Sequence, residues 1–489
     1  MNVGYTAPFL LSFQEGVSLV EQADGETLLS ASFVQLSLKG LSKGLRAALG
    51  RLSSGGATVE ELVGLMARSD GGLGPPTLLY YLEHFVKLGL ICHTVVCDAV
   101  KLATIVPISP SYQFKSKRFL PEQRYVLSRF AYLHQDKKPQ AAGGEWVLEC
   151  PLGHAKLLLH DWRTHALLHA LSKPHNLAEL CQEFQPLSAD AIAGCLSLLL
   201  ACQSLCEAKD NASRSSVRST RTRQEEALAQ WEFHDLLFHS RSRLGRHRNP
   251  YRGSYRFVGQ IPAQPVVKAP MSQDAITLYR PDLEALKKED QPLTRVLEER
   301  RSIRQHGASP ITLKQLGEFL YRTARVKQIV QIETPKHQLS RRAYPSGGAC
   351  YELEVYIASH HCEGLAAGFY HYCPKTHQLY KLATPTPDLD ALLEGARHAT
   401  REDKKPQVLI VLAACFQRIA WKYESIAYAT ILKDVGVLYQ TMYLVATAMG
   451  LAASAVGGGN ADLFAAAAGT NYYAESSVGE FVLGSRVTK

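Results

Sequence analysis

The sequence predicts an α+β protein in which a layered C-terminal domain follows two smaller helical units. Helix and strand patterns alternate over roughly the last 200 residues, which is typical of a sheet with flanking helices. A diverged repeat fills the N-terminal part, and a polar stretch separates the two regions. With 489 residues the chain is long enough for several domains, since roughly 100 to 200 residues form one.

The N-terminal repeat reads strand, helix, helix, helix in each copy. Alternating apolar residues in FVQLSL and KLLLHD predict the two strands. In both copies the middle helix starts with a capping box, formed by Thr58 with Glu61 in the first and by Asn176 with Glu179 in the second. Three short helices flanked by strands predict two winged-helix-like domains.

The predicted third helices, LLYYLEHFVKLGL and AIAGCLSLLLACQSL, indicate what these domains bind. A winged helix that reads DNA needs arginine or lysine there for phosphates, and these segments have almost none. Both are mostly apolar and are predicted to be core, so we expect no nucleic acid partner. The architecture resembles the leader-peptide recognition elements of enzymes that modify ribosomal peptides, which add a peptide strand to a sheet edge.

The chain is predicted to divide at NASRSSVRSTRTR, which is rich in Ser, Thr and Arg. The predicted parts are winged-helix-like domains at residues 1–106 and 107–208, a polar basic linker at residues 209–230 and the C-terminal domain at residues 231–489. In the last part LEVYIAS, QVLIVLAA and EFVLGS are predicted strands, and GFYHYCPKTHQLYKL is a predicted hairpin. One helix is expected to begin near Thr312 and a long one to end at Met449.

Composition and charge limit the class of protein further. A hydrophobic content of 46% with 20% charged residues is globular, and a net charge of +9 that is mostly spread out points only weakly to an anionic partner. The 11 cysteines lack metal-ligand spacing, so we expect reduced, mostly buried thiols and no metal. Without a signal region or a run of roughly 18 apolar residues, a cytoplasmic protein with no membrane partner is expected.

Three segments of the C-terminal domain carry residues suited to chemistry. ERRSIRQ, residues 299–305, offers guanidinium groups and a hydroxyl to a phosphate, although a solvated basic helix face has the same pattern. AYPSGGA, residues 343–349, lets the backbone approach a ligand, although a tight turn before a strand has the same pattern. LAASAVGGGN, residues 451–460, offers backbone N–H groups to a redox cofactor such as a flavin at its N5 atom.

The order and spacing of ERRSIR, PSGG, FYHYCPKTHQL, GLAASAVGGG and VLGSR resemble those of the nitroreductase superfamily. FYHYCPKTHQLYKL and WEFHDLLFHSRSR are particularly similar to segments of the SagB-type azoline dehydrogenases, and cyanobactin-type thiazoline oxidases share the extended N-terminal arrangement. The resemblance covers about residues 231–486. It implies a nitroreductase-like FMN-binding domain and a homodimer in which residues of both chains hold the flavin.

The resemblance also implies roles for individual residues. Arg300, Ser302 and Arg486 are implied phosphate contacts, Arg301 is counted with them as cofactor-binding, and Arg304 is the implied cation near flavin N1 and O2. Pro345, Ser346 and Gly347, with the adjoining Gly348, match the segment that reaches across the dimer interface, and Val456, Gly457 and Gly458 match the backbone at N5.

Lys422 and Tyr423 in AWKYESIAYA are the implied catalytic pair, because SagB-type azoline dehydrogenases have an adjacent Lys and Tyr here and ordinary nitroreductases lack them. Without that context they would be ordinary surface residues. We expect them at the start of the long helix, where burial beside a flavin and the positive helix end favour a neutral amine. Lys422 would remove the Cα proton of a thiazoline while hydride leaves the neighbouring carbon, and Tyr423 would orient or polarise the ring.

The predicted function is therefore FMN-dependent oxidation of thiazolines, or also oxazolines, in a heterocyclised precursor peptide, with oxygen as the acceptor. Two alternatives stay open. One is an NAD(P)H-dependent flavin reductase of the nitroreductase type, which the missing GxGxxG motif does not exclude but which the long N-terminal repeat disfavours. The other is a non-catalytic protein that docks a precursor peptide, against which the intact ERRSIR, PSGG and KY segments count.

Overall fold

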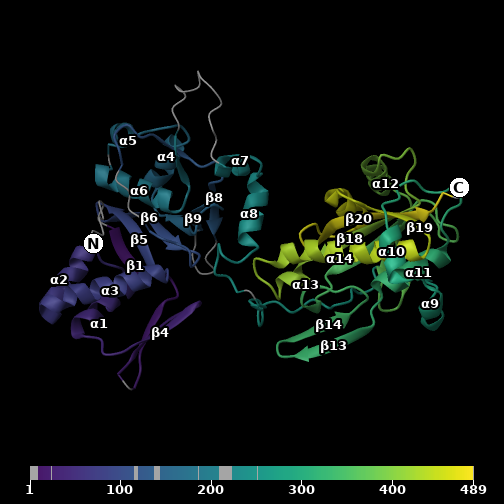
Figure 1. Cartoon of the computed structure of the whole chain (residues 1–489), viewed down its shortest axis with the longest axis horizontal. Helices are drawn as coiled ribbons and strands as arrows, with labels where there is room; N and C mark the ends of the chain where they lie inside the picture. The colour runs from purple at the N-terminus through teal and green to yellow at the C-terminus, as the bar shows by residue number, and fades with distance from the viewer. Residues whose placement is uncertain are drawn as a thin grey trace. The chain divides into compact units, whose positions relative to one another are not determined.

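The computed structural model describes residues 9–23, 25–114, 119–136, 144–185, 187–208, 223–250 and 252–487. The chain folds into two compact units, Met1–Asn249 and Pro250–Lys489 (Figure 1). Residues 209–222 of the predicted linker lie outside the described residues, and α7 (Arg223–Ala229) occupies most of the remainder. None of the described helices combines the length and the apolar character that a membrane span requires.

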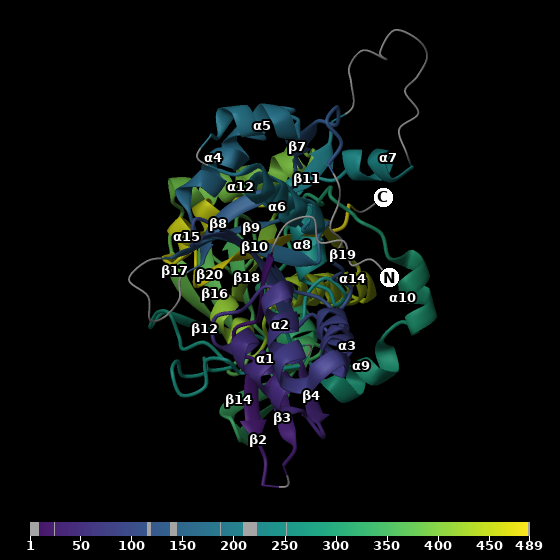
Figure 2. The same cartoon turned by 90° about the vertical axis from the view of Figure 1, so that its left-hand side faces the viewer.

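The first unit is built on a six-stranded sheet. Its strand order is β1 (Phe9–Phe13), β5 (Ile91–Cys97), β6 (Val100–Pro107), β10 (Ala155–Leu159), β9 (Glu145–Glu149) and β8 (Tyr132–Asp136). Smaller sheets are formed by β2 (Ser18–Glu21), β3 (Thr27–Ala31) and β4 (Val34–Leu38), and by β7 (Tyr125–Leu127) with β11 (Leu205–Glu207) (Figure 2). Both predicted winged-helix segments contribute strands to the large sheet, and their division at residue 106 stays a prediction.

The helices of the first unit follow the predicted repeat. The first copy has α1 (Lys43–Ser53), α2 (Val59–Asp70) and α3 (Gly74–Lys87), and the second has α4 (Trp162–Ala170), α5 (Leu177–Glu183) and α6 (Ala189–Ala201); α8 (Phe233–Arg241) lies outside the repeat. The capping box of Thr58 and Glu61 starts α2, and that of Asn176 and Glu179 starts α5. Strands and helices therefore begin where local side-chain hydrogen bonds and apolar periodicity predict them.

Two features of the first unit differ from the expectation. Helix α6 is mostly buried as predicted, but α3 leaves Leu79 45% and Tyr80 68% exposed, so α3 is not wholly a core helix. Helix α8 packs its Leu236 with Phe130 and Cys150 in a small apolar core. Because that apolar face is buried there, residues 231–249 belong to the first compact unit, although the sequence places them with the C-terminal domain.

The second unit contains a seven-stranded sheet in which all neighbouring strands are antiparallel. Its order is β12 (Ala275–Thr277), β17 (Gln378–Ala383), β16 (Gly368–Cys373), β15 (Leu353–Ser359), β18 (Val408–Cys415), β20 (Glu475–Ser485) and β19 (Leu451–Val456). A separate hairpin is formed by β13 (Gln328–Glu333) and β14 (Lys336–Arg341). The predicted strands and the predicted hairpin of this domain are confirmed.

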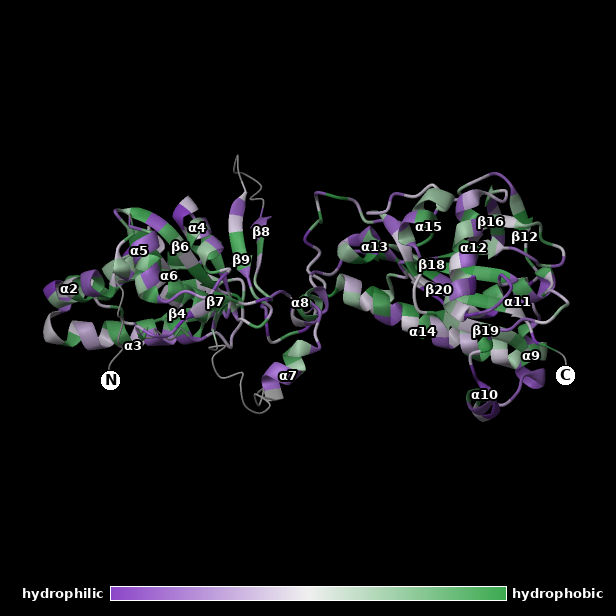
Figure 3. Cartoon of the chain, turned by 90° about the horizontal axis from the view of Figure 1, so that it is seen from above, coloured by the Kyte–Doolittle hydropathy of each residue, from purple (hydrophilic) through white to green (hydrophobic). Residues whose placement is uncertain are grey.

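Helices cover both faces of this sheet. The helices of this unit are α9 (Leu283–Glu289), α10 (Leu293–Glu299), α11 (Leu313–Ala324), α12 (Pro387–Thr400), α13 (Phe416–Ala420), α14 (Ala427–Ala448) and α15 (Ala461–Ala468). One apolar core joins α11 and α14 to the sheet, and another joins α12 and α15 to its opposite face; Figure 1 shows α12 and α14 on opposite sides of β18 and β20. The strand β18, VLIVLAAC, is apolar on both faces because both are covered (Figure 3).

The predicted fold class is confirmed: helices and an antiparallel sheet form the α+β layers. All eleven cysteines are free and most are buried, as expected. Burial raises the pKa of several of these thiols, for example to about 12 for Cys350, which keeps them protonated.

Candidate active site

Lys422 and Tyr423 lie in the turn that links α13 to α14. Their backbone N–H groups donate to Ile419 O, at 3.0 Å and 2.9 Å, so the turn continues from the end of α13. The expectation that they start the long helix is wrong, because α14 begins only at Ala427. Ser425 has a φ of 58°, a left-handed conformation that interrupts the helix before α14 can begin.

The predicted Pro345–Gly348 turn contacts this Lys–Tyr pair. Lys422 Nζ donates to Gly348 O at 3.0 Å. Gly348 has a φ of 61°, and a Cβ added there would lie 2.3 Å from Tyr423 Oη. Only glycine therefore permits both the backbone conformation and the approach of the tyrosine hydroxyl. The structure thus brings together two segments that are more than seventy residues apart in sequence.

Two buried acids that sequence reasoning missed hold the same turn. Gly347 N–H donates to Asp434 Oδ2 at 2.9 Å, and Ser346 Oγ donates to Glu352 Oε2 at 3.3 Å. Glu352 is 0% and Asp434 5% exposed. Burial, and then the charge of Asp434 and a hydrogen bond with it, raise the pKa of Glu352 to about 8. Glu352 is therefore protonated at neutral pH, which avoids a second negative charge beside Asp434 in the core.

This proton predicts a loss of stability as pH rises from about 4.5 to about 8. Because the pKa of Glu352 is raised from 4.5 to about 8 on folding, its stabilising effect is complete below the unfolded value and disappears as pH rises through about 8. We expect the thermal unfolding temperature to fall across that range, and Glu352→Gln, which stays neutral, to remove most of the fall. The exposed Glu363→Gln is the matched control. An unchanged fall between about pH 4.5 and 8 in Glu352→Gln would show that other groups cause it.

A buried ionic cluster anchors α13 and thereby the Lys–Tyr turn. Arg418 Nη2 lies 2.8 Å from Glu354 Oε1, and His371 Nε2 lies 2.9 Å from Glu354 Oε2. Arg418 also donates to Tyr351 O at 2.7 Å. Burial by itself would raise the pKa of Glu354, but Arg418 and His371 lower it to about 2. The carboxylate is therefore charged and paired inside the core, where it holds Arg418 of α13.

Arg300 and Ser302, predicted phosphate contacts, meet at Tyr443 of α14. The Arg300 guanidinium lies 5.3 Å from the Tyr443 ring centroid, and Ser302 Oγ lies 2.8 Å from Tyr443 Oη. The same Tyr443 hydroxyl accepts a hydrogen bond from Ala455 N–H of β19 at 2.7 Å. Since Ser302 is exposed, its hydroxyl remains accessible to an anion.

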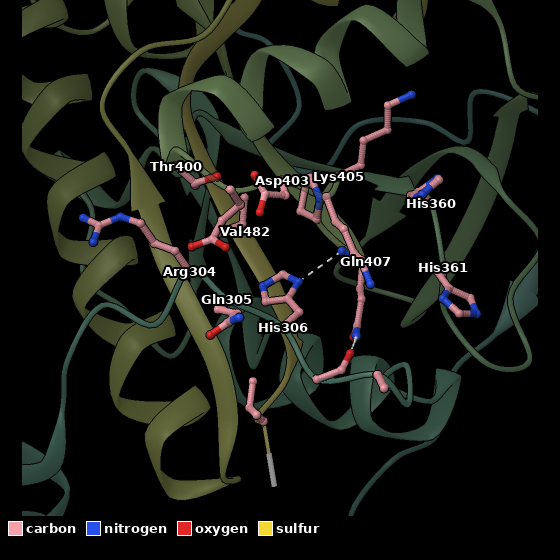
Figure 4. A pocket seen from close by; sticks show the side chains of 16 residues that line it. Arg304, Gln305, His306, His360, His361, Thr400, Asp403, Lys405, Gln407 and Val482 are labelled. Carbon is pink, nitrogen blue, oxygen red and sulfur yellow. Dashed lines mark hydrogen bonds between the residues drawn. The ribbon is translucent and has the colours of Figure 1, made fainter. Parts of the chain in front are cut away.

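The other predicted arginines lie elsewhere around this end of the sheet. Arg486 Nε donates to Leu451 O at 3.2 Å, four residues along β19 from Ala455. Arg301 is exposed. Arg304 lines a cavity of about 700 Å³ together with His306, but Figure 4 shows its guanidinium pointing away from the histidines at positions 360 and 361. Arg300 and Ser302 therefore share Tyr443 as a neighbour, whereas Arg486 contacts the backbone of Leu451 and Arg304 lines the cavity with His306.

The predicted glycine segment follows the C-terminal end of β19, whereas Arg486 contacts its N-terminal residue, Leu451. Val456 is buried and ends the strand, whereas Gly457 and Gly458 are exposed. A Cβ at either glycine would meet nothing within 4 Å, so a ligand has open access to this backbone. Gly458 also lines a cavity of about 680 Å³ next to α12 and α15.

These groups fit a flavin in kind. Arg300 and Ser302 supply a guanidinium and a hydroxyl for a phosphate, and the exposed glycines supply backbone N–H donors for the edge of a ring. In one chain they form separate patches: the Lys422 turn contacts α14 at Asp434, and the Ser302 patch contacts it nine residues later at Tyr443. At about 1.5 Å per residue, these contact points are roughly 14 Å apart. In the part of the chain that the structure describes, no group of His, Cys, Asp and Glu could hold a metal ion.

Three family models match successive parts of the chain. The ThcOx helix-turn-helix domain matches residues 5–116, the cyanobactin oxidase ThcOx matches residues 125–248, and the nitroreductase family matches residues 297–484. The first match covers the first copy of the N-terminal repeat, the second covers the second copy together with α8, and the third covers most of the candidate site.

Among individual proteins, a nitroreductase-like protein of Methanocaldococcus jannaschii is 27% identical over 184 residues, which is 38% of this chain and 85% of that protein. The microcin B17-processing protein McbC of Escherichia coli is 36% identical over 116 residues, which is 23% of this chain and 42% of McbC. The trifolitoxin-processing protein TfxB of Rhizobium leguminosarum bv. trifolii is 30% identical over 134 residues, which is 27% of this chain and 35% of TfxB. The matches to these two peptide-processing proteins thus span less than half of their length.

A solved structure with a similar fold is the Escherichia coli microcin synthetase McbBCD with truncated pro-MccB17 bound. The similar chain is 20% identical, with a TM-score of 0.33; the match covers 49% of this chain and 89% of that one.

Proposed function

The chain belongs to the cyanobactin oxidases with a nitroreductase-family domain, and from this premise we propose that it oxidises thiazoline rings in peptides to thiazoles. It is a flavin-dependent oxidoreductase. The observation that supports this substrate is the position of the Lys422–Tyr423 pair. Lys422 Nζ lies 3.0 Å from Gly348 O in the Pro345–Gly348 turn. Two relatives, McbC and TfxB, are named for processing microcin B17 and trifolitoxin, which supports a heterocyclised precursor peptide as the substrate, with oxazolines as a second ring class.

Oxidation of a thiazoline to a thiazole removes one proton and one hydride from adjacent ring carbons. Lys422 takes the proton from Cα, which the neighbouring imine and carbonyl acidify. The amine donates an N–H to Gly348 O at 3.0 Å, which holds it against the turn. Tyr423, whose hydroxyl lies beside Gly348, orients the ring. A bound flavin supplies the acceptor for the hydride that leaves the neighbouring carbon.

FMN is the proposed flavin, because Arg300 and Ser302 at Tyr443 suit a single terminal phosphate. The proposed assembly is a homodimer. In that arrangement one subunit holds the phosphate while the partner contributes the Pro345–Gly348 turn. Further proposed contacts of the cofactor are Arg301, Arg304, Val456, Gly457, Gly458 and Arg486.

The test is to purify the full chain, record its visible spectrum, and incubate it in air with a heterocyclised peptide while following the peptide mass. We expect a yellow protein with flavin absorbance and a loss of two hydrogens, roughly 2 Da, for each ring. A yellow protein that leaves the peptide unchanged, but oxidises a reduced nicotinamide with a nitro or quinone acceptor, would replace this proposal by a reductase. A colourless protein that takes up no added FMN would favour a non-catalytic docking protein.

A further inference from the structure

A groove lies beside the Lys422 turn, between residues 258–265 and the β13–β14 hairpin. Its volume is about 500 Å³, and Trp421, the residue before Lys422, is among the residues that line it. Val258 and Ile261 also line it, and each of these apolar side chains is 47% exposed. Exposed apolar side chains beside a candidate catalytic residue are a surface on which a ligand can bury area.

Two hydrogen bonds fix the groove to the catalytic turn. Trp421 Nε1–H donates to Ile261 O at 2.7 Å, and Ser254 N–H donates to Lys422 O at 2.9 Å. The Tyr255 ring lies 5.6 Å from the Trp421 ring and 6.0 Å from Lys422 Nζ, measured to its centroid. The groove wall and the candidate base therefore share the Trp421–Lys422 backbone and the Tyr255 ring, which sets their relative position.

The hairpin on the other side of the groove has unpaired strand edges. Within the residues described, β13 and β14 pair with each other and with no third strand, so each keeps one row of backbone donors and acceptors. Gln331 of β13 and Gln338 of β14 line the groove. Gln331 and Gln338 are directly opposite each other, so their side chains project to one face of the hairpin, and their amides can donate to and accept from the backbone of an extended peptide.

We propose that this groove binds the peptide chain that adjoins the azoline, in extended form, with apolar substrate side chains against Val258 and Ile261. The inference rests on the proposed function, because a ring oxidised at Lys422 is part of a peptide backbone. Residues next to that ring follow at intervals of about 3.8 Å, so the chain must cross a surface adjoining Lys422. The apolar wall gives affinity for flanking residues independently of the ring.

The test compares two peptides that contain one thiazoline each. The long peptide has several apolar residues on both sides of the ring, and the short one has a single residue on each side. In Val258→Asp and Ile261→Asp, a charge replaces the apolar contact. We expect the Kd of the fluorescein-labelled long peptide, measured by anisotropy, to rise about tenfold. The ratio of kcat/KM between long and short peptide should fall by about the same factor. Val100→Asp, at a similarly exposed valine of the first unit, should leave both quantities unchanged.

Equal Kd values and equal ratios in the variants and the unaltered protein would overturn the inference. So would a sedimentation result in which Val258→Asp dissociates a dimer without changing peptide affinity, because a second copy would then cover the groove. If the unaltered protein oxidises neither peptide, the proposed function fails, and the anisotropy comparison still decides whether the groove binds peptide. Circular dichroism checks that each variant is folded.

Discussion

Lys422→Ala is expected to lower kcat for thiazoline oxidation about 1,000-fold while leaving flavin binding and the fold intact. A positioned general base contributes typically 10²- to 10⁴-fold, and alanine removes it completely. Flavin should be retained, because the Arg300 and Ser302 patch contacts α14 at Tyr443, roughly 14 Å from the Lys422 turn. Mass spectrometry of the peptide in samples quenched at successive times measures kcat, and the visible spectrum of the protein measures its flavin content. A variant that keeps its flavin and oxidises thiazoline at the native rate would show that Lys422 is not the base.

Lys422 also donates to Gly348 O, so Lys422→Ala would lose activity also if it only displaced the Pro345–Gly348 turn. Lys422→Arg separates the two roles, because a guanidinium donates hydrogen bonds but is not deprotonated in proteins. We expect Lys422→Arg to be nearly as inactive as Lys422→Ala. Recovery of activity in the arginine variant would assign Lys422 to positioning the turn. Lys288→Ala, at an exposed lysine of α9, is the control for loss of a positive charge.

The regular elements could be predicted because their signals are local. The capping boxes at Thr58 and Asn176 and the apolar strand β18 need only neighbouring residues to act. The start of α14 could not be predicted in this way. The apolar and helix-favouring residues continue from Ile419 through Ala427, and nothing in their pattern indicates the left-handed Ser425 that separates two helices.

The candidate site could be predicted only in part for a related reason. Lys422 and the Pro345–Gly348 turn each belong to a short motif that the sequence shows. Their contact, however, depends on the tertiary fold, which places the turn beside the segment between α13 and α14. Glu352 and Asp434 are 82 residues apart, so their interaction has no local signal. A partial signal did exist, since Glu352 precedes the otherwise apolar strand LEVYIAS and Glu354 lies within it, and a buried carboxylate needs a specific partner.

Arg418→Met is expected to destabilise the second unit by about 3 to 5 kcal/mol, because it leaves the Glu354 carboxylate buried without its main partner. Arg418 is 7% and Glu354 1% exposed, so water cannot replace the guanidinium. For a unit of this size the unfolding temperature should fall by roughly 10 °C, measured by circular dichroism. Arg295→Met is the matched control: it removes an exposed pair with Glu299, whose contribution is expected below about 1 kcal/mol.

The pH dependence and a double variant show whether the unpaired charge causes this loss. In the unaltered protein the pKa of Glu354 is lowered from 4.5 to about 2, so the stabilisation is present above the unfolded value and is lost as pH falls through about 2. In Arg418→Met the unpaired carboxylate takes up a proton more readily. The stability that this variant loses relative to the unaltered protein should therefore be smaller at mildly acidic pH than at neutral pH. Arg418→Met with Glu354→Gln should recover much of the stability by removing both charges. If the loss of stability is equal at both pH values and the double variant recovers no stability, lost packing of the arginine side chain explains the loss.

Because Arg418 lies on α13, three residues before Trp421, the single variant should also move the Lys422 turn and lower thiazoline oxidation at temperatures where the unit is still folded.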